Sequence, residues 1–171
     1  MKRISLIILI ICMLFSLCAC RTNQSHTDTY ANYYYRALEL QYGTSEPVIV
    51  CERRSIIQFN NDFALILENY INGPKMSNHT TPFPAGTYLE QVTLGNDRAY
   101  VILSSHLSLL TGSDLTIACA CLTKTVTELA GVHSVEISAK DGTLNGAPSM
   151  VLTEKDFSYF ENYLVRSQKR S

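Results

Sequence analysis

The sequence lacks most of the patterns that mark a catalytic or nucleic-acid-binding protein. It has no His-Glu-x-x-His helix and no Gly-x-Ser-x-Gly turn, and its eight glycines are scattered rather than gathered in a phosphate-binding loop. Its 14 basic and 15 acidic residues are nearly balanced, which gives no basic stripe for nucleic acid. Glu52 beside Arg53 and Arg54 is interpreted as a surface charge cluster at a strand end. These absences predict a non-enzymatic protein with no cofactor, no metal and no nucleic-acid partner.

Long apolar runs are also missing after the first 20 residues. Met1-Lys2-Arg3 precedes an apolar run from Ile4 to Leu17, which has the form of a secretory signal peptide. The run falls short of the roughly 20 apolar residues that a membrane-spanning helix needs. It ends in Leu17-Cys18-Ala19-Cys20, which resembles the lipobox of bacterial lipoproteins. The resemblance implies that residues 1–19 are a signal peptide and that Cys20 becomes a lipidated N-terminus; an uncleaved signal anchor is the alternative.

The segment that follows is polar and contains almost nothing suited to a core. We therefore expect residues 20–32 to comprise the lipidated cysteine and a flexible tether, ahead of a domain at 33–164 and a basic tail at 165–171. A diacylglycerol on Cys20 would hold the protein at the outer face of the cytoplasmic membrane, because two acyl chains anchor stably where one does not.

The body of the chain alternates strand and helix patterns. Strands are predicted at 34–42 and 47–52, at 88–94 and 98–104 around the turn Gly95-Asn96-Asp97, and at 133–139. One helix is predicted from the apolar stripe Phe63, Ile66, Leu67, Tyr70 and Ile71, and Leu65 falls on its other side. A second helix follows Gly112 and ends at Gly131, and a short one closes the chain at 153–166.

The helix boundaries carry recognisable capping residues. Asn60 or Asn61 is expected to cap the first main helix, and Ser113 the second. Because each main helix shows a single apolar stripe, we expect both to pack on one face of a sheet. The predicted fold class is α/β (α+β): a two-layer sandwich whose sheet is mixed or antiparallel, with two main helices on one face.

Cysteine is scarce in the domain, where only Cys51, Cys119 and Cys121 remain. Cys119 and Cys121 are two apart on a helix and so point about 200° away from each other. They cannot share one metal ion or form a disulfide with each other. Cys119 is predicted to lie in the core and Cys121 on the far side. The odd count argues against a disulfide framework, and whether Cys51 pairs with Cys119 or Cys121 is left open.

The histidines likewise show no clear pattern of a metal site or a catalytic site. His26, His79, His106 and His133 contain no pair at the i, i+4 spacing of a helical metal site. A Cys–His hydrolase would need Cys51 as nucleophile with His79 or His133 as base within about 3 Å. Cys51 is more simply interpreted as a strand residue, and His133 as a half-buried structural residue at the start of a strand.

The body of the chain resembles the sporulation and spore germination (GerMN) domain. The likeness is carried by ENYINGP, by PFPAGTYLEQVTLGNDRAYVILS and by LTKTVTELAGVHSVEISAKDG, in that order. Cys51 departs from the pattern, since members often have proline before the glutamate there. The resemblance implies a non-catalytic module related to ring-building domains that assemble between the two membranes of a developing spore. It defines no binding residues.

We therefore expect a membrane-anchored lipoprotein whose domain serves as a binding or scaffold module in sporulation, germination or cell-envelope assembly. Its partner would be another envelope or sporulation protein, taken up on a free sheet face or edge, and homo-oligomerisation is left open. The alternatives are an exported cell-wall hydrolase using Cys51 and a lipoprotein that captures a small ligand.

Overall fold

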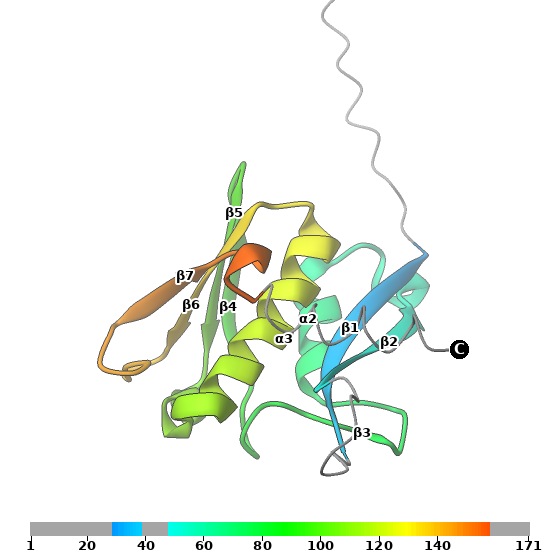
Figure 1. Ribbon diagram of the computed structural model, residues 1–171. Helices are drawn as coiled ribbons and strands as arrows, with labels where there is room; N and C mark the ends of the chain where they lie inside the picture. The colour runs from blue at the N-terminus through cyan, green and yellow to red at the C-terminus, as the bar shows by residue number, and fades with distance from the viewer. Residues whose placement is uncertain (1–28, 39–47, 158–171) are drawn as a thin grey trace, which may run out of the picture.

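The computed structural model of the chain describes residues 29–38 and 48–157 (Figure 1). The predicted signal peptide, Cys20, most of the tether, the turn at 43–45 and the basic tail lie outside these residues. The elements, in chain order, are β1 (Tyr30–Ala37), β2 (Ile49–Ser55), η1 (Ile57–Phe59), α2 (Phe63–Ile71), β3 (His79–Thr80), β4 (Leu89–Leu94), β5 (Arg98–Leu103), η2 (Ser105–Leu109), α3 (Gly112–Ala130), β6 (Ser134–Ala139), β7 (Ser149–Leu152) and η3 (Glu154–Phe157).

The strands form two sheets rather than the single sheet that was expected. The first has the order β2-β1-β3, and the second the order β4-β5-β6-β7. Among the strands of the described residues, only β5 and β6 run parallel, so the second sheet is mixed and the first antiparallel. Helix α3 crosses the middle of the molecule with one sheet on each side (Figure 1). The α+β class with a mixed sheet and two main helices is confirmed.

Strand β1 begins earlier in the chain than its pattern indicated. It starts at Tyr30, within the segment expected to be tether, and pairs with β2 from Tyr30 opposite Ser55 to Arg36 opposite Ile49. Ala31 is only 3% exposed and belongs to the core. The strand is not apparent from the sequence because this short stretch is polar. Its strand conformation depends on contacts with β2 and with a helix farther along the chain.

Helix α2 confirms its predicted stripe but not its predicted cap. Ile66, Leu67, Tyr70 and Ile71 are buried, and Leu65 is 45% exposed on the opposite side. The N-cap is Asp62, whose carboxylate accepts the backbone amides of Ala64 and Leu65. Asn60 and Asn61 instead adopt positive φ in the turn that joins η1 to the helix, a conformation that asparagine tolerates well.

The predicted hairpin is confirmed, and its one irregularity has a structural reason. Leu94 of β4 pairs with Ala99 of β5, and the inward residues Ala99, Val101 and Leu103 are fully buried. The alternation of β4 breaks at Glu90 because the register shifts there, which is a β-bulge.

The C-terminal part of the domain differs from expectation. Strand β7 was missed: it pairs antiparallel with β6, placing Val135 opposite Leu152. Four residues after a loop that contains Gly146 and Pro148 give too little alternation to predict a strand. Of the predicted closing helix, only η3 lies within the described residues.

Helix α3 is buried on both sides, which overturns the placement of Cys121. Cys119 packs in the main core as predicted, but Cys121 is 0% exposed rather than on a free outer side. It forms a second cluster with Ile49, Ile117 and Ala120. The helix also starts differently, since Thr111 is its N-cap and no side chain caps it, whereas Gly131 ends it in the left-handed conformation as expected.

Candidate functional site

Cys51, the candidate nucleophile, does not lie beside either candidate base, His79 or His133. Its side chain is exposed on the outer face of β2, whereas His79 lies on the inner face, with its Nδ1 3.5 Å from the Oε2 of Glu52. His133 immediately precedes β6 of the other sheet and is exposed, not half-buried. Partial burial and the charge of Glu128 raise the pKa of the Cys51 thiol. A thiol held protonated, with neither candidate histidine beside it, is the opposite of an activated nucleophile.

Cys119 and Cys121 are also unreactive, because burial keeps their thiols protonated. Cys51, Cys119 and Cys121 are all free thiols. Burial raises the pKa of Cys119 to about 12 and moves that of Cys121 further in the same direction. Neither thiol reaches solvent, so they act as small apolar side chains in the packing of α3.

Glu52 and Arg54 are buried, not part of a surface cluster as the sequence suggested. They are 5% and 7% exposed, and Arg54 Nε donates to Glu52 Oε1 over 2.8 Å. The backbone amides of Lys75 and Met76 also donate to the Glu52 carboxylate. Burial alone would raise the pKa of Glu52, but the hydrogen bond and charge of Arg54, with these amides, lower it overall. The pair therefore fastens the loop after α2 to the sheet.

Tyrosine hydroxyls complete this buried polar layer at the end of α2. Tyr33 donates to the carbonyl of Ile66 over 3.2 Å, and Tyr35 to the carbonyls of Tyr70 and Gly73 over 3.0 and 3.1 Å. The Arg54 guanidinium lies over both tyrosine rings, 4.9 and 5.2 Å from their centroids, and donates to Gly73. These contacts join the buried side chains of Tyr33, Tyr35 and Arg54 to the backbone of α2 and of the residues that follow it. The most polar buried cluster is thus accounted for by structure.

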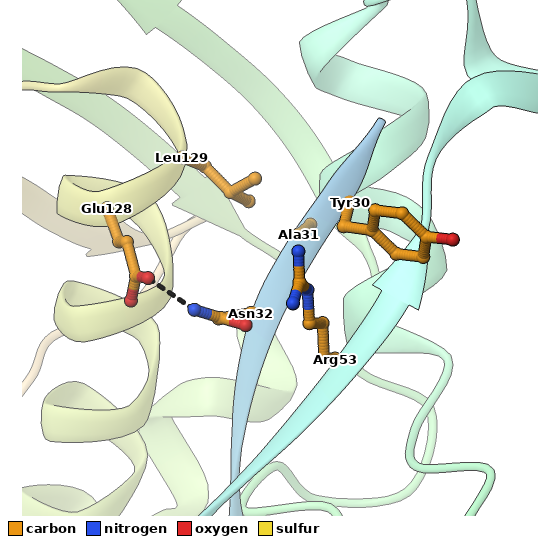
Figure 2. Close-up of a pocket in the computed structure, with 6 residues that line it drawn as sticks. All are labelled: Tyr30, Ala31, Asn32, Arg53, Glu128 and Leu129. Carbon is orange, nitrogen blue, oxygen red and sulfur yellow. Dashed lines mark hydrogen bonds between the residues drawn. The ribbon is translucent and has the colours of Figure 1, made fainter. Parts of the chain in front are cut away.

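A shallow groove lies between the start of β1 and the last turns of α3. It is lined by Tyr30, Ala31, Asn32, Arg53, Glu128 and Leu129 and has a volume of about 230 Å³ (Figure 2). The side chains of Asn32 and Glu128 meet across it in a hydrogen bond. This volume is below the roughly 300–1,000 Å³ of small-molecule pockets. The groove suits part of a larger partner rather than a whole ligand.

The surface around the groove combines aromatic rings with charged groups. Arg53 holds its guanidinium 4.7 Å from the ring centroid of Tyr30, and Lys124 holds its amine 5.1 Å from that of Tyr34. The Tyr34 hydroxyl donates to Glu128 over 2.7 Å. Burial first, and then Glu128, raise the pKa of Tyr34, so this hydroxyl stays a donor. We call this region, Tyr30, Asn32, Tyr34, Arg53 and Glu128, the groove surface.

Sequence reasoning assigned no binding residue here. Tyr30 and Asn32 fell in the expected tether, and Glu128 is a single acidic residue in a helix. The one available signal was the succession of tyrosines from Tyr30 to Tyr35, which is unusual in a solvated linker.

The edges of the sheets offer a second kind of site. Among the described strands, β2 and the two-residue β3 end the first sheet, and β4 and β7 end the second. Strand β2 carries Glu52, Arg53 and Arg54, and β4 carries the bulge at Glu90; charges and bulges discourage edge-to-edge pairing. Strand β7, Ser149–Leu152, has neither.

Two further observations concern the described residues only. None of the helices formed by residues 29–38 and 48–157 is long and apolar enough to span a bilayer. Nor does this part of the chain gather three or more histidine, cysteine, aspartate or glutamate side chains into a candidate metal centre.

Comparison with known proteins identifies the family. The family model Germane, described as sporulation and spore germination, matches residues 33–145. The structure resembles the first GerMN domain of the sporulation protein GerM from Bacillus subtilis, with a TM-score of 0.54 and 15% identity, over 72% of this chain and 98% of that one. It also resembles the tandem GerMN domains of GerM, with a TM-score of 0.53 and 18% identity over 72% of this chain.

The chain spans only 45% of the tandem-domain structure, so it corresponds to a single GerMN unit. A search of curated proteins finds no significant match. At these identities the structural likeness shows a shared fold. The family match covers well over half of the sequence, and the chain therefore belongs to the Germane family of sporulation and spore germination domains.

Proposed function

We propose that this protein is a lipid-anchored, non-enzymatic GerMN module on the outer face of the cytoplasmic membrane, where it binds another envelope protein during sporulation or germination. The observation that carries the proposal is the order of parts in the sequence. A signal-peptide-like run ends at the lipobox Leu17-Cys18-Ala19-Cys20, and a polar segment then leads into a domain of the sporulation family. Localisation is the mechanism: the lipid supplies the membrane and the domain supplies a surface.

The structural roles of the described polar groups support the proposal that the module is non-enzymatic. Glu52, Arg54 and the inner-face tyrosines hold the end of α2, and the exposed Cys51 has a raised pKa and no histidine on its face. The β7 edge remains as a place where a protein partner would bind.

Lipidation is tested by labelling cells with an alkyne fatty acid and isolating the protein. We expect the label in the wild type and in Cys18→Ser, and its loss in Cys20→Ser. The adjacent cysteine is a matched control, because both changes remove one thiol from the same short stretch. Label that persists in Cys20→Ser would overturn the anchor at this residue.

The biological role is tested by deleting the gene in a spore-forming host. We expect a defect in sporulation, germination or envelope integrity that wild-type protein and Cys51→Ala both restore, because the exposed thiol has no chemical task. Failure of Cys51→Ala to complement, with the fold intact and a hydrolytic activity lost, would favour the hydrolase interpretation instead.

A further inference from the structure

We infer that the domain rests with one particular end on the lipid surface of the membrane in which it is anchored. The end is formed by Tyr30, Arg53, Ile57 and Leu65, which we call the entry end because the N-terminal segment joins the domain there. The inference rests on the proposed lipid anchor at Cys20. It adds an orientation and a second membrane contact that the anchor alone does not supply.

The residues of the entry end are brought together by three connections. Tyr30 is the first residue of β1 and lies opposite Ser55, the last residue of β2. The backbone amide of Ile56 donates to the carbonyl of Thr29 over 3.0 Å, which fixes η1 beside the start of β1. Helix α2 runs in the same direction as β1, since Tyr33 bonds to Ile66 and Tyr35 to Tyr70. Leu65, in the first turn of α2, therefore lies at the same end.

The chemistry of this end suits the boundary between lipid head groups and acyl chains. Ile57 is 63% exposed and Tyr30 is 51% exposed, with the Arg53 guanidinium stacked on the tyrosine ring. Tyrosine favours the interface because its ring is apolar and its hydroxyl is polar, and arginine binds phosphate while its stem lies along apolar groups. Asp62 is engaged in capping α2, and Glu128 accepts from Asn32 and Tyr34. Three of the four residues of the entry end, Tyr30, Ile57 and Leu65, are aromatic or aliphatic, so the contact is mainly apolar and its salt dependence is expected to be small.

The length of the segment between Cys20 and Tyr30 indicates that the entry end, rather than the opposite end, faces the membrane. The opposite end also exposes large apolar side chains, namely Leu38, Met76, Tyr88 and Leu109, so apolarity alone does not decide the orientation. Nine residues separate Cys20 from Tyr30. A flexible chain of that length has an end-to-end distance of about 17 Å. Helix α3, with 19 residues, is about 28 Å long and separates the two ends. The entry end is thus held near the bilayer at high effective concentration, where even a weak contact is occupied.

The absence of tryptophan from the chain allows a direct test. Ile57→Trp places a single reporter at the entry end, and Leu109→Trp places a matched one at the opposite end, where Leu109 is 72% exposed. Each lipidated full-length variant is reconstituted into vesicles of phosphatidylcholine and phosphatidylglycerol, with and without acyl-chain-brominated phosphatidylcholine. For the tryptophan at 57 we expect at least a twofold loss of fluorescence when brominated lipid is present, and a blue shift of its emission when the protein is bound to vesicles. For the tryptophan at 109 we expect no change in either.

The outcomes separate this inference from the proposed anchor. If the protein floats with the vesicles but the tryptophan at 57 is not quenched, or both reporters are quenched equally, the orientation is wrong while the anchor stands. If the protein does not float, the anchor itself fails. In a second variant, Arg53→Gln added to Ile57→Trp should reduce the quenching, and unchanged thermal unfolding would show that this reduction does not come from a loss of fold.

Discussion

Two neighbouring arginines show how little a residue's identity reveals about its environment. Arg53 and Arg54 occupy alternate faces of β2, so one stacks on the exposed Tyr30 and the other is buried against Glu52. A buried charge that loses its partner is far more costly than an exposed one. The difference follows from the alternation of a strand, once it is known which face is covered.

We predict that Arg54→Leu lowers the free energy of unfolding by about 3–5 kcal/mol, because it leaves the buried Glu52 carboxylate without its cation. Arg53→Leu is the matched control and should change that free energy by less than about 0.5 kcal/mol. Urea denaturation followed by circular dichroism measures both. Equal transition midpoints for the two variants would contradict the buried ion pair.

The pH dependence of stability follows from Glu52. Its pKa is lowered from 4.5 in the folded protein, so it contributes stability that is present above pH 4.5 and is lost as pH falls through the folded pKa. Glu52→Gln should therefore lower the free energy of unfolding at pH 7. The difference in this free energy between the variant and the wild type should become smaller as the pH drops below 4.5. Unfolding curves at a series of pH values measure this difference. A difference that stays constant down to pH 3 would show that Glu52 is not stabilised as a carboxylate.

At the scale of elements, local patterns predicted what local interactions decide. The stripe of α2, the hairpin around 95–97 and the stop at Gly131 are confirmed, because each depends on residues a few positions apart. The caps expected at Asn60 or Asn61 and at Ser113 were wrong by one or two positions, since the N-caps are Asp62 and Thr111. Polar residues follow one another at both sites, and only the backbone conformation shows which of them occupies the N-cap position.

Removing the observed cap should have a measurable cost. We predict that Asp62→Ala lowers the free energy of unfolding by about 1 kcal/mol, because two amides of the first turn lose their acceptor. Ser113→Ala provides the control at α3, where no side chain caps the helix, and should have almost no effect. Thermal denaturation of both variants measures the difference. A larger loss in Ser113→Ala would contradict the assigned caps.

At the scale of the molecule, α3 joins two sheets that share no strand. It packs on β5 and β6 on one side and on β1 on the other, where the Thr125 hydroxyl accepts the backbone amide of Tyr34 over 3.1 Å. This hydrogen bond satisfies part of the β1 edge that β3 leaves uncovered. The two sheets therefore depend on one helix for their common core.

We predict that Leu122→Ala lowers the free energy of unfolding by about 2–5 kcal/mol and reduces hydrogen-exchange protection in both sheets together, because Leu122 is 1% exposed at the centre of α3. Leu109→Ala, at a site 72% exposed, should leave protection unchanged. Loss of protection in the second sheet alone would mean that the two sheets unfold independently.

Local sequence patterns were enough to predict the order of the main helices and strands, the apolar faces of α2 and β5, and the family resemblance that the family match confirmed. These features depend on periodicity and turn residues within short stretches. Three features became visible in the folded protein alone: Cys121 is buried, Glu52 and Arg54 form an internal pair, and Tyr30 begins a strand. The burial of Cys121 and the strand at Tyr30 depend on where β1 and β2 lie against α3, a contact between segments about 90 residues apart. The Glu52–Arg54 pair depends on the end of α2 and the loop after it, which cover the other face of β2. No local pattern records either contact.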